Sequence, residues 1–268
     1  MSFLLVSIDA MPLALSRFFL PGFLSFLLIL FLKIKIKLKD ILKFILAGLI
    51  GIFFYNFFLN TGQQTVSAGA TSFIVNCNPL FATFIGFYFL KQKVKLHFWL
   101  GIIICIIGVF IISLGTHTEF NLNFGVIYIL LAALLTSSYF HIIKPLVNKY
   151  GALTSFSYTV FFGTLPMLVW SADVYNIVYS ASVEVLLQIL WLSIVCTLLG
   201  YYTWTYSVGY FGANKASFFL FLIPVFSIII DFIVFQKVVN TYTLIGGTLI
   251  LFSVSIIIFL NLKENKFI

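Results

Sequence analysis

The residues in this sequence that could do chemistry are polar side chains inside long apolar segments. Asn76, Asn78 and Pro79 interrupt one such segment near its middle. A proline has no N–H and clashes with the carbonyl four residues earlier, so Pro79 predicts a helix kink that frees the carbonyl of Val75. These polar groups could contact a solute, or the amides could simply join neighbouring helices.

Arg17 is a second candidate, because its positive charge is permanent and it lies within another apolar segment. A guanidinium surrounded by hydrocarbon needs an acceptor or water. Arg17 could therefore anchor the carboxylate or phosphate of a solute. The alternative is a side chain that extends to the outer lipid headgroups.

Polar aromatic residues and one amide form a third group, in two of the apolar segments. They could line a cavity and stack on a flat or cationic solute. They could equally form belts at the two membrane surfaces. The residues are Tyr55, Asn56, Tyr201, Tyr202, Trp204 and Tyr206.

Two ionisable residues are candidates for proton coupling. Asp231 lies inside an apolar segment, where a carboxyl that binds and releases a proton could drive transport. His141 titrates near neutral pH and suits a proton relay. The alternatives are an ion pair of Asp231 with Arg17 or Lys237, and a place for His141 at the membrane surface.

Signatures of enzymes and metal centres are missing from the sequence. We find no paired acids at catalytic spacing, no His/Cys cluster and no glycine-rich phosphate loop. Cys77, Cys105 and Cys196 all lie in apolar segments at spacings that match no metal site, so we expect small buried side chains. We therefore expect neither an enzyme nor a bound cofactor or metal ion.

The composition is that of a membrane protein. The chain has 268 residues, of which 62% are hydrophobic and 8% charged, whereas roughly a quarter of the residues of a soluble domain are charged. The net charge of +8 does not indicate nucleic acid, because the lysines lie in short loops between apolar segments. We expect an all-α polytopic membrane protein that contacts the lipid bilayer and a small-molecule solute.

Nine segments are long and apolar enough to cross a bilayer as helices, which takes about 20 residues each. They are residues 10–32, 41–59, 67–90, 97–114, 124–143, 155–172, 184–207, 214–236 and 241–260. The odd-numbered loops and the C-terminal tail carry most of the lysines, which predicts that they are cytoplasmic. Nine spans then place the N-terminus outside a bacterial inner membrane.

An internal duplication relates two parts of the chain at a constant offset of 145 residues. The first copy contains Ala68, Ser72, Phe73, Pro79, Phe81, Val94 and Gly101, and the second contains Ala213, Ser217, Phe218, Pro224, Phe226, Val239 and Gly246. We expect two repeats, at residues 1–115 and 124–260, with Pro79 and Pro224 as structural kinks. The duplicated segments run in opposite directions through the bilayer, which is typical of secondary transporters.

In their order and spacing, several residues resemble the EamA-type members of the drug/metabolite transporter superfamily. They are residues 12–18, Gly48, Gly51, Tyr55, residues 68–79, Gly101, Gly108, Gly125, Lys144, Tyr150, Gly151, Gly200, Tyr201, Trp204 and Tyr206. The resemblance implies two inverted halves of five helices each, with both termini cytoplasmic. Because residues 12–18 resemble the second helix of the family, we expect the first helix to be absent.

These observations favour a secondary transporter, or permease, that moves a small metabolite by alternating access, with proton coupling as an option. Two alternatives stay open: a flippase of lipids or lipid-linked sugars, and an inactive truncated transporter. The substrate, the direction of transport and the oligomeric state are left open, with a homodimer as one arrangement.

Overall fold

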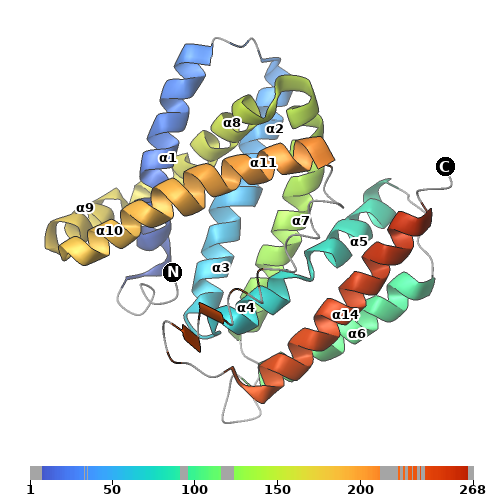
Figure 1. Cartoon of the computed structure of the whole chain (residues 1–268). Helices are drawn as coiled ribbons and strands as arrows, with labels where there is room; N and C mark the ends of the chain where they lie inside the picture. The colour runs from blue at the N-terminus through green and yellow to red at the C-terminus, as the bar shows by residue number, and fades with distance from the viewer. Residues whose placement is uncertain are drawn as a thin grey trace. The chain divides into compact units, whose positions relative to one another are not determined.

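The computed structural model describes residues 8–32, 34, 36–90, 96–115, 124–211, 223, 226, 229–230, 232–233, 236 and 239–264. These parts of the chain form helices and turns without a strand, so the predicted all-α fold class is confirmed (Figure 1). The chain packs as two compact units. Unit 1 is Met1–Asn60 with Ser138–Ala216, and unit 2 is Thr61–Ser137 with Ser217–Ile268.

Unit 1 combines helices from the beginning of the chain with helices from its middle. The early elements are α1 (Ala10–Leu32), α2 (Leu38–Gly48), a π-helical segment η2 (Leu49–Phe54) and α3 (Tyr55–Gln63), whose last residues belong to unit 2. The later elements are the end of α7 (Phe124–Tyr150), α8 (Ala152–Thr164), η3 (Leu165–Trp170), α9 (Ser171–Ser180), α10 (Val183–Trp191), the π-helical η4 (Leu192–Leu199) and α11 (Gly200–Phe211). Only Gly151, at φ 82°, separates α7 from α8, a conformation that glycine adopts without strain.

Small residues let the helices of unit 1 approach closely. A Cβ atom on Gly48 would lie 2.6 Å from the backbone nitrogen of Gly163, and one on Gly163 would lie 2.6 Å from Cβ of Ile52. Apolar side chains such as Phe18 and Ile52 are fully buried beside this contact. In lipid, where the hydrophobic effect does not drive helices together, such close packing stabilises their association.

Unit 2 contains the interrupted helix on which two predicted site residues lie. Its elements are α4 (Ala68–Val75), α5 (Asn78–Leu90), α6 (Leu96–Leu114), the first part of α7, and α14 (Thr241–Glu264). Ser67 caps α4, since its hydroxyl accepts a hydrogen bond of 3.2 Å from the backbone N–H of Ala70. A turn at Asn76 and Cys77 separates the two α-helices, and Pro79 is the second residue of α5.

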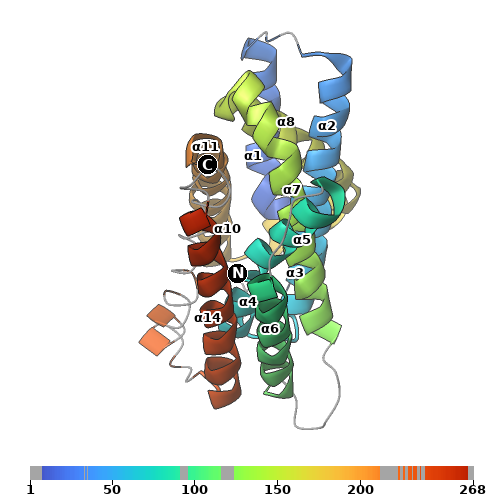
Figure 2. The ribbon, with the colours of Figure 1, turned by 90° about the vertical axis from the view of Figure 1, so that its right-hand side faces the viewer.

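Helices α6 and α14 lie side by side in unit 2 (Figures 1 and 2). Their backbones meet at Gly108 and Gly246, and the hydroxyl of Ser253 donates a hydrogen bond of 2.6 Å to the carbonyl of Gly101. Adding 145 turns Gly101 into position 246 and Gly108 into position 253. The two contacts are thus images of each other under the offset found in the sequence, as in a contact with two-fold symmetry.

The two π-helical segments obey the same offset. Residues 49–54 of η2 become residues 194–199, which lie within η4. π-Helical turns are rare and concentrate at functional sites. Their recurrence at equivalent positions indicates a local geometry shared by the two halves.

Helices able to cross a membrane are present at the predicted places. In the described part of the chain, six helical runs are long and apolar enough, and two shorter apolar helices lie within predicted spans 97–114 and 241–260. The six runs are Ala10–Phe31, Leu38–Gln63, Ala68–Tyr88, Phe124–Tyr150, Ala152–Ser180 and Val183–Tyr210. Most of the predicted span 214–236, with Pro224 and Asp231, lies outside the described residues.

Candidate functional site

Arg17 is buried in unit 1 and is held by a hydroxyl from another helix. Its side chain is 8% exposed, and its Nε donates a hydrogen bond of 2.9 Å to Oγ1 of Thr197. The guanidinium carbon lies 4.9 Å from the ring centre of Phe18, within range of a cation–π contact. Arg17 follows the start of α1 by seven residues, roughly 10 Å along the helix, so its charge lies inside a candidate span.

The π-helical segment η4 places Thr197 next to this arginine. Besides accepting from Arg17, the hydroxyl of Thr197 donates 2.9 Å to the carbonyl of Leu192, five residues earlier. That spacing is the hydrogen-bond interval of a π-helix. The irregular turn therefore fixes the orientation of the hydroxyl that receives Arg17.

Tyr201, one turn beyond Thr197, adds a phenol to the cluster. Its ring packs edge-on against Phe18, with 5.5 Å between ring centres, and its hydroxyl lies beside Arg17 and Asn56. The predicted residues Arg17, Asn56 and Tyr201 are thus neighbours, although 184 positions separate the first from the last in sequence.

Tyr55 and Asn56 reach the cluster from the junction of η2 and α3. The amide nitrogen of Asn56 donates 2.7 Å to the carbonyl of Ile52, and its amide oxygen has no hydrogen-bond partner among the described residues. Tyr55 lies close enough to Arg17 and Tyr201 to interact with them electrostatically. We call Arg17, Tyr55, Asn56, Thr197 and Tyr201 the arginine cluster.

The arginine cluster offers a fixed positive charge, two phenols, a hydroxyl and an amide oxygen within one unit. Such a set can bind an anionic group at the guanidinium and accept hydrogen bonds from a donor group at Asn56. Of its members, only Thr197 was not predicted. The signal that could have identified Thr197 was a hydroxyl inside an apolar segment. Threonine hydroxyls in such segments commonly bond to their own helix, so this signal is weak.

The remaining polar aromatic residues lie apart from this cluster. Trp204 packs against Phe140, with 5.5 Å between ring centres. Tyr202 contacts Phe156 edge-on at 5.9 Å, and the exposed Tyr206 is involved in a ring stack on the outside of α11. The predicted aromatic residues therefore do not form one group, because successive side chains of a helix point in different directions.

His141 lies on α7 and is half-buried. Asp231, the other candidate for proton coupling, is outside the described residues. The role predicted for these two residues stays a prediction.

In unit 2, the break between α4 and α5 holds two buried amides. Asn76 and Asn78 are 1% and 2% exposed, and neither amide oxygen has a hydrogen-bond partner within the described parts of the chain. The amide nitrogen of Asn76 donates 2.8 Å to the carbonyl of Ser72. Ser137 of α7 donates 2.8 Å to the backbone carbonyl of Asn78. The break therefore holds two buried amide oxygens that are available as hydrogen-bond acceptors.

Between these amides, Cys77 meets Cys105 of α6. The two buried thiols are free, and their sulfur atoms lie 2.9 Å apart. Cys196, in contrast, is exposed on η4, so the expectation that all three cysteines are buried is wrong for this one. The sequence could not separate the cases, because an exposed position on a membrane helix is as apolar as a buried one.

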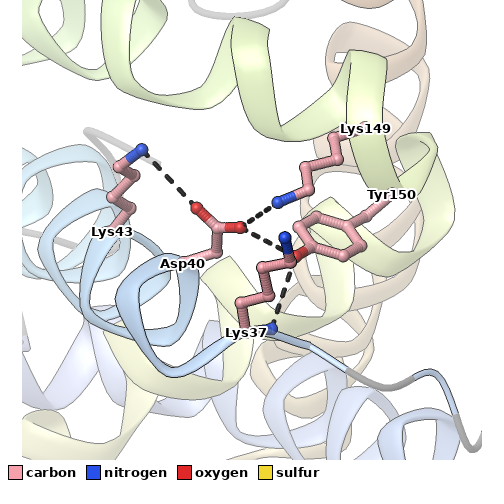
Figure 3. A network of polar contacts seen from close by, with 5 residues as sticks. All are labelled: Lys37, Asp40, Lys43, Lys149 and Tyr150. Carbon is pink, nitrogen blue, oxygen red and sulfur yellow. Dashed lines mark hydrogen bonds and ion pairs between the residues drawn. The ribbon is translucent and has the colours of Figure 1, made fainter.

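A charged network at one end of unit 1 was not predicted from the sequence (Figure 3). Asp40 of α2 receives a charged hydrogen bond from Lys149 and one of 2.7 Å from the hydroxyl of Tyr150, both at the end of α7. Lys43 lies 3.5 Å from the other carboxylate oxygen. The backbone N–H of Lys37 donates to Tyr150 at 3.4 Å. The network joins α2 to the turn between α7 and α8.

Comparison with known proteins places this arrangement in a family. The model of the EamA-like transporter family matches residues 1–114 and 123–259. The uncharacterized transporter YdfC of Bacillus subtilis (strain 168) is 32% identical over 229 residues, covering 85% of this chain and 74% of the relative. An uncharacterized transporter of Archaeoglobus fulgidus is 28% identical over 233 residues, covering 87% of this chain and 83% of the relative.

Two further likenesses are more distant. A probable terminal-alkyne amino-acid exporter of Streptantibioticus cattleyicolor is 24% identical, covering 80% of this chain and 71% of the relative. One solved crystal structure matches 93% of this chain and 86% of its own chain with a TM-score of 0.62 at 14% identity, which is a likeness of fold.

The family match covers both halves of the sequence, and with it the helices that carry Arg17 and Asn76. The chain is a multi-pass membrane protein that belongs to the EamA-like transporter family.

Proposed function

We propose that this chain is a secondary transporter of a small metabolite that carries a carboxylate, with the arginine cluster as the site that binds this group. The observation that carries the proposal is the buried guanidinium of Arg17, oriented by Thr197 and flanked by Tyr55, Asn56 and Tyr201. Ionisable residues inside spans are costly and are retained where a function needs them. An arginine binds carboxylates through paired, directional hydrogen bonds.

Alternating access is the mechanism that we propose for this site. The repeated glycine crossing of α6 and α14 and the paired π-helical segments support an inverted repeat, which is how many secondary transporters reach two states. The arginine cluster would be open to each side of the membrane in turn. As a separate proposal for unit 2, we infer that Asn76 and Asn78, whose buried amide oxygens lack a partner among the described residues, contact the solute.

Amino acids are the solute class to examine first. The relative from Streptantibioticus cattleyicolor is named as a probable exporter of an amino acid, and an amino acid supplies both the carboxylate for Arg17 and a donor group for Asn56. The experiment is counterflow in proteoliposomes, with the purified full chain and a set of the twenty radiolabelled amino acids. We expect uptake of at least one of them against an unlabelled internal pool.

Variants then locate the site. Arg17→Gln should lower the rate of counterflow at least tenfold, and Arg17→Lys should restore part of it, because lysine keeps the charge and loses the paired geometry. Thr197→Val should also lower the rate. The matched control is Thr203→Val, which removes the same hydroxyl from an exposed position that bonds to its own helix. Wild-type rates in Arg17→Gln and Thr197→Val would overturn the proposed site, and no counterflow of any amino acid would overturn amino acids as the solute class.

We further propose that transport is coupled to protons and that the lysine-rich loops face the cytoplasm of a bacterium. A pH gradient should drive net uptake of the solute by wild-type protein and fail to do so in Asp231→Asn. A green fluorescent protein fused to the C-terminus should be fluorescent in cells, because it folds only on the cytoplasmic side. A dark fusion would contradict the orientation, and an unchanged pH response would contradict the role of Asp231.

A further inference from the structure

The first turns of α2 carry a row of leucines that are exposed on the surface of the protein. Leu38, Leu42 and Leu46 are 75%, 62% and 46% exposed. Residues four apart share one face of a helix, so these three side chains form a continuous strip. Since the run Leu38–Gln63 is a candidate span, this strip is in a position to contact lipid hydrocarbon. We call it the leucine strip.

Two lysines border the leucine strip. Lys39 and Lys43 are both exposed and are also four residues apart, so they lie one above the other on the helix. At about 100° per residue, they flank the leucines rather than oppose them. An apolar strip beside a pair of cations is complementary to a molecule with a hydrocarbon chain and a negative head.

The acidic residue of this segment is turned away from the surface. Asp40 lies on the opposite face of α2, where Phe44 and Ala47 are also buried. Lys149 and Tyr150 bind its carboxylate (Figure 3). Lys43 reaches the same carboxylate at 3.5 Å while its side chain stays 56% exposed. The network therefore leaves a surface that is cationic and apolar, without an exposed carboxylate between residues 36 and 46.

We propose that this surface binds an anionic phospholipid, with the phosphate at Lys39 and Lys43 and an acyl chain along the leucine strip. Clusters of lysines at the end of a membrane helix attract anionic headgroups, and the structure adds a hydrocarbon path that continues from the cations. Zwitterionic lipids have a phosphate too, but their own ammonium group offsets the attraction. The site is separate from the arginine cluster and does not depend on the proposed transport function.

Native mass spectrometry of the full chain in detergent tests the site. The probes are phosphatidylglycerol and phosphatidylcholine with identical acyl chains. We expect the wild-type protein to bind phosphatidylglycerol more tightly, and Lys39→Gln to weaken that binding about fivefold, the contribution of one lysine near a charged surface. Lys39→Gln with Lys43→Gln should weaken it roughly twentyfold. Binding of phosphatidylcholine should stay unchanged.

Controls separate a specific site from net charge and from misfolding. Lys144→Gln removes one charge from an exposed position on α7 and should leave lipid binding as in the wild type. Unchanged melting temperatures in phosphatidylcholine show that the variants are folded. Equal binding of the two lipids, or an equal loss in Lys144→Gln and Lys39→Gln, overturns the proposal. Displacement of bound phosphatidylglycerol by inorganic phosphate at the same concentration also overturns it, because the acyl chain then contributes nothing.

Discussion

Gly108 of α6 and Gly246 of α14 face each other so closely that neither position has room for a methyl group. A Cβ atom on Gly108 would lie 2.6 Å from the carbonyl oxygen of Gly246, and the reverse approach is closer still. In a bilayer, the two helices gain stability from this backbone proximity rather than from expelling water.

The first prediction concerns the glycine crossing. Gly108→Ala and Gly246→Ala should each destabilise the protein by about 1–3 kcal/mol, the usual cost of adding a methylene to a packed site. The measurement is thermal unfolding in detergent, followed by intrinsic fluorescence. Gly200→Ala is the matched control, since its Cβ would lie 3.5 Å from the nearest atom, the carbonyl oxygen of Val195. Equal melting temperatures for all three variants would contradict the role of the crossing.

The second prediction separates stability from transport at the break between α4 and α5. Asn78→Leu replaces a buried amide whose oxygen lacks a described partner with an apolar side chain of similar size. We expect the melting temperature to stay the same or rise, because burying an unpaired polar group is costly. The rate of counterflow should fall at least tenfold if the amide contacts the solute. A stable variant with the wild-type rate would remove Asn78 from the solute site.

The third prediction concerns the two thiols. Diamide should oxidise Cys77 and Cys105 to a disulfide, in which each thiol loses a proton and the pair passes two electrons to the reagent. Their sulfur atoms are already in contact at 2.9 Å, so little movement is required. Mass spectrometry of the digested protein should find the two peptides joined, whereas Cys196 should stay unpaired. Failure to join them in the folded protein would contradict the placement of α6 against the break.

The fourth prediction concerns Asp40 and Lys149. Lys149→Met should destabilise the protein by about 1–3 kcal/mol, because it leaves a buried carboxylate with fewer donors. Adding Asp40→Asn to that variant should recover part of the loss. A double-mutant cycle of unfolding free energies measures the coupling of the pair, which should be about 1 kcal/mol because Lys149 is 44% exposed. Asp173→Asn, at an exposed position on α9, should change the stability little, and zero coupling would contradict a role for the ion pair.

The positions of the helices were predictable because membrane spans follow from hydrophobicity and length alone. The predicted span 10–32 coincides with α1, and the other described helices contain their predicted spans almost entirely. The predicted spans were shorter than the helices where polar residues begin. The predicted span 124–143 stops at the first lysine, whereas α7 continues to Tyr150 because its backbone hydrogen bonds do not depend on hydrophobicity.

The partners of the polar residues were harder to predict. Arg17 was identified as a candidate, but its partner Thr197 was not, because a contact across 180 residues leaves no trace in composition or periodicity. The ion pair of Asp40 with Lys149 was missed for the same reason. The π-helical segments also lack a compositional signal, since leucine, isoleucine and phenylalanine serve equally in α- and π-helices.

The interleaving of the two compact units sets the order in which the chain can mature during synthesis. Unit 1 needs residues up to Ala216, and unit 2 needs residues up to Ile268, although each begins in the first quarter of the chain. The early helices carry the close-packing surfaces around Gly48 and Gly108. They therefore lie in the bilayer without their later neighbours until the ribosome has added these. At roughly ten residues per second, that delay lasts many seconds, during which these small-residue surfaces lack the helices that cover them in the folded protein.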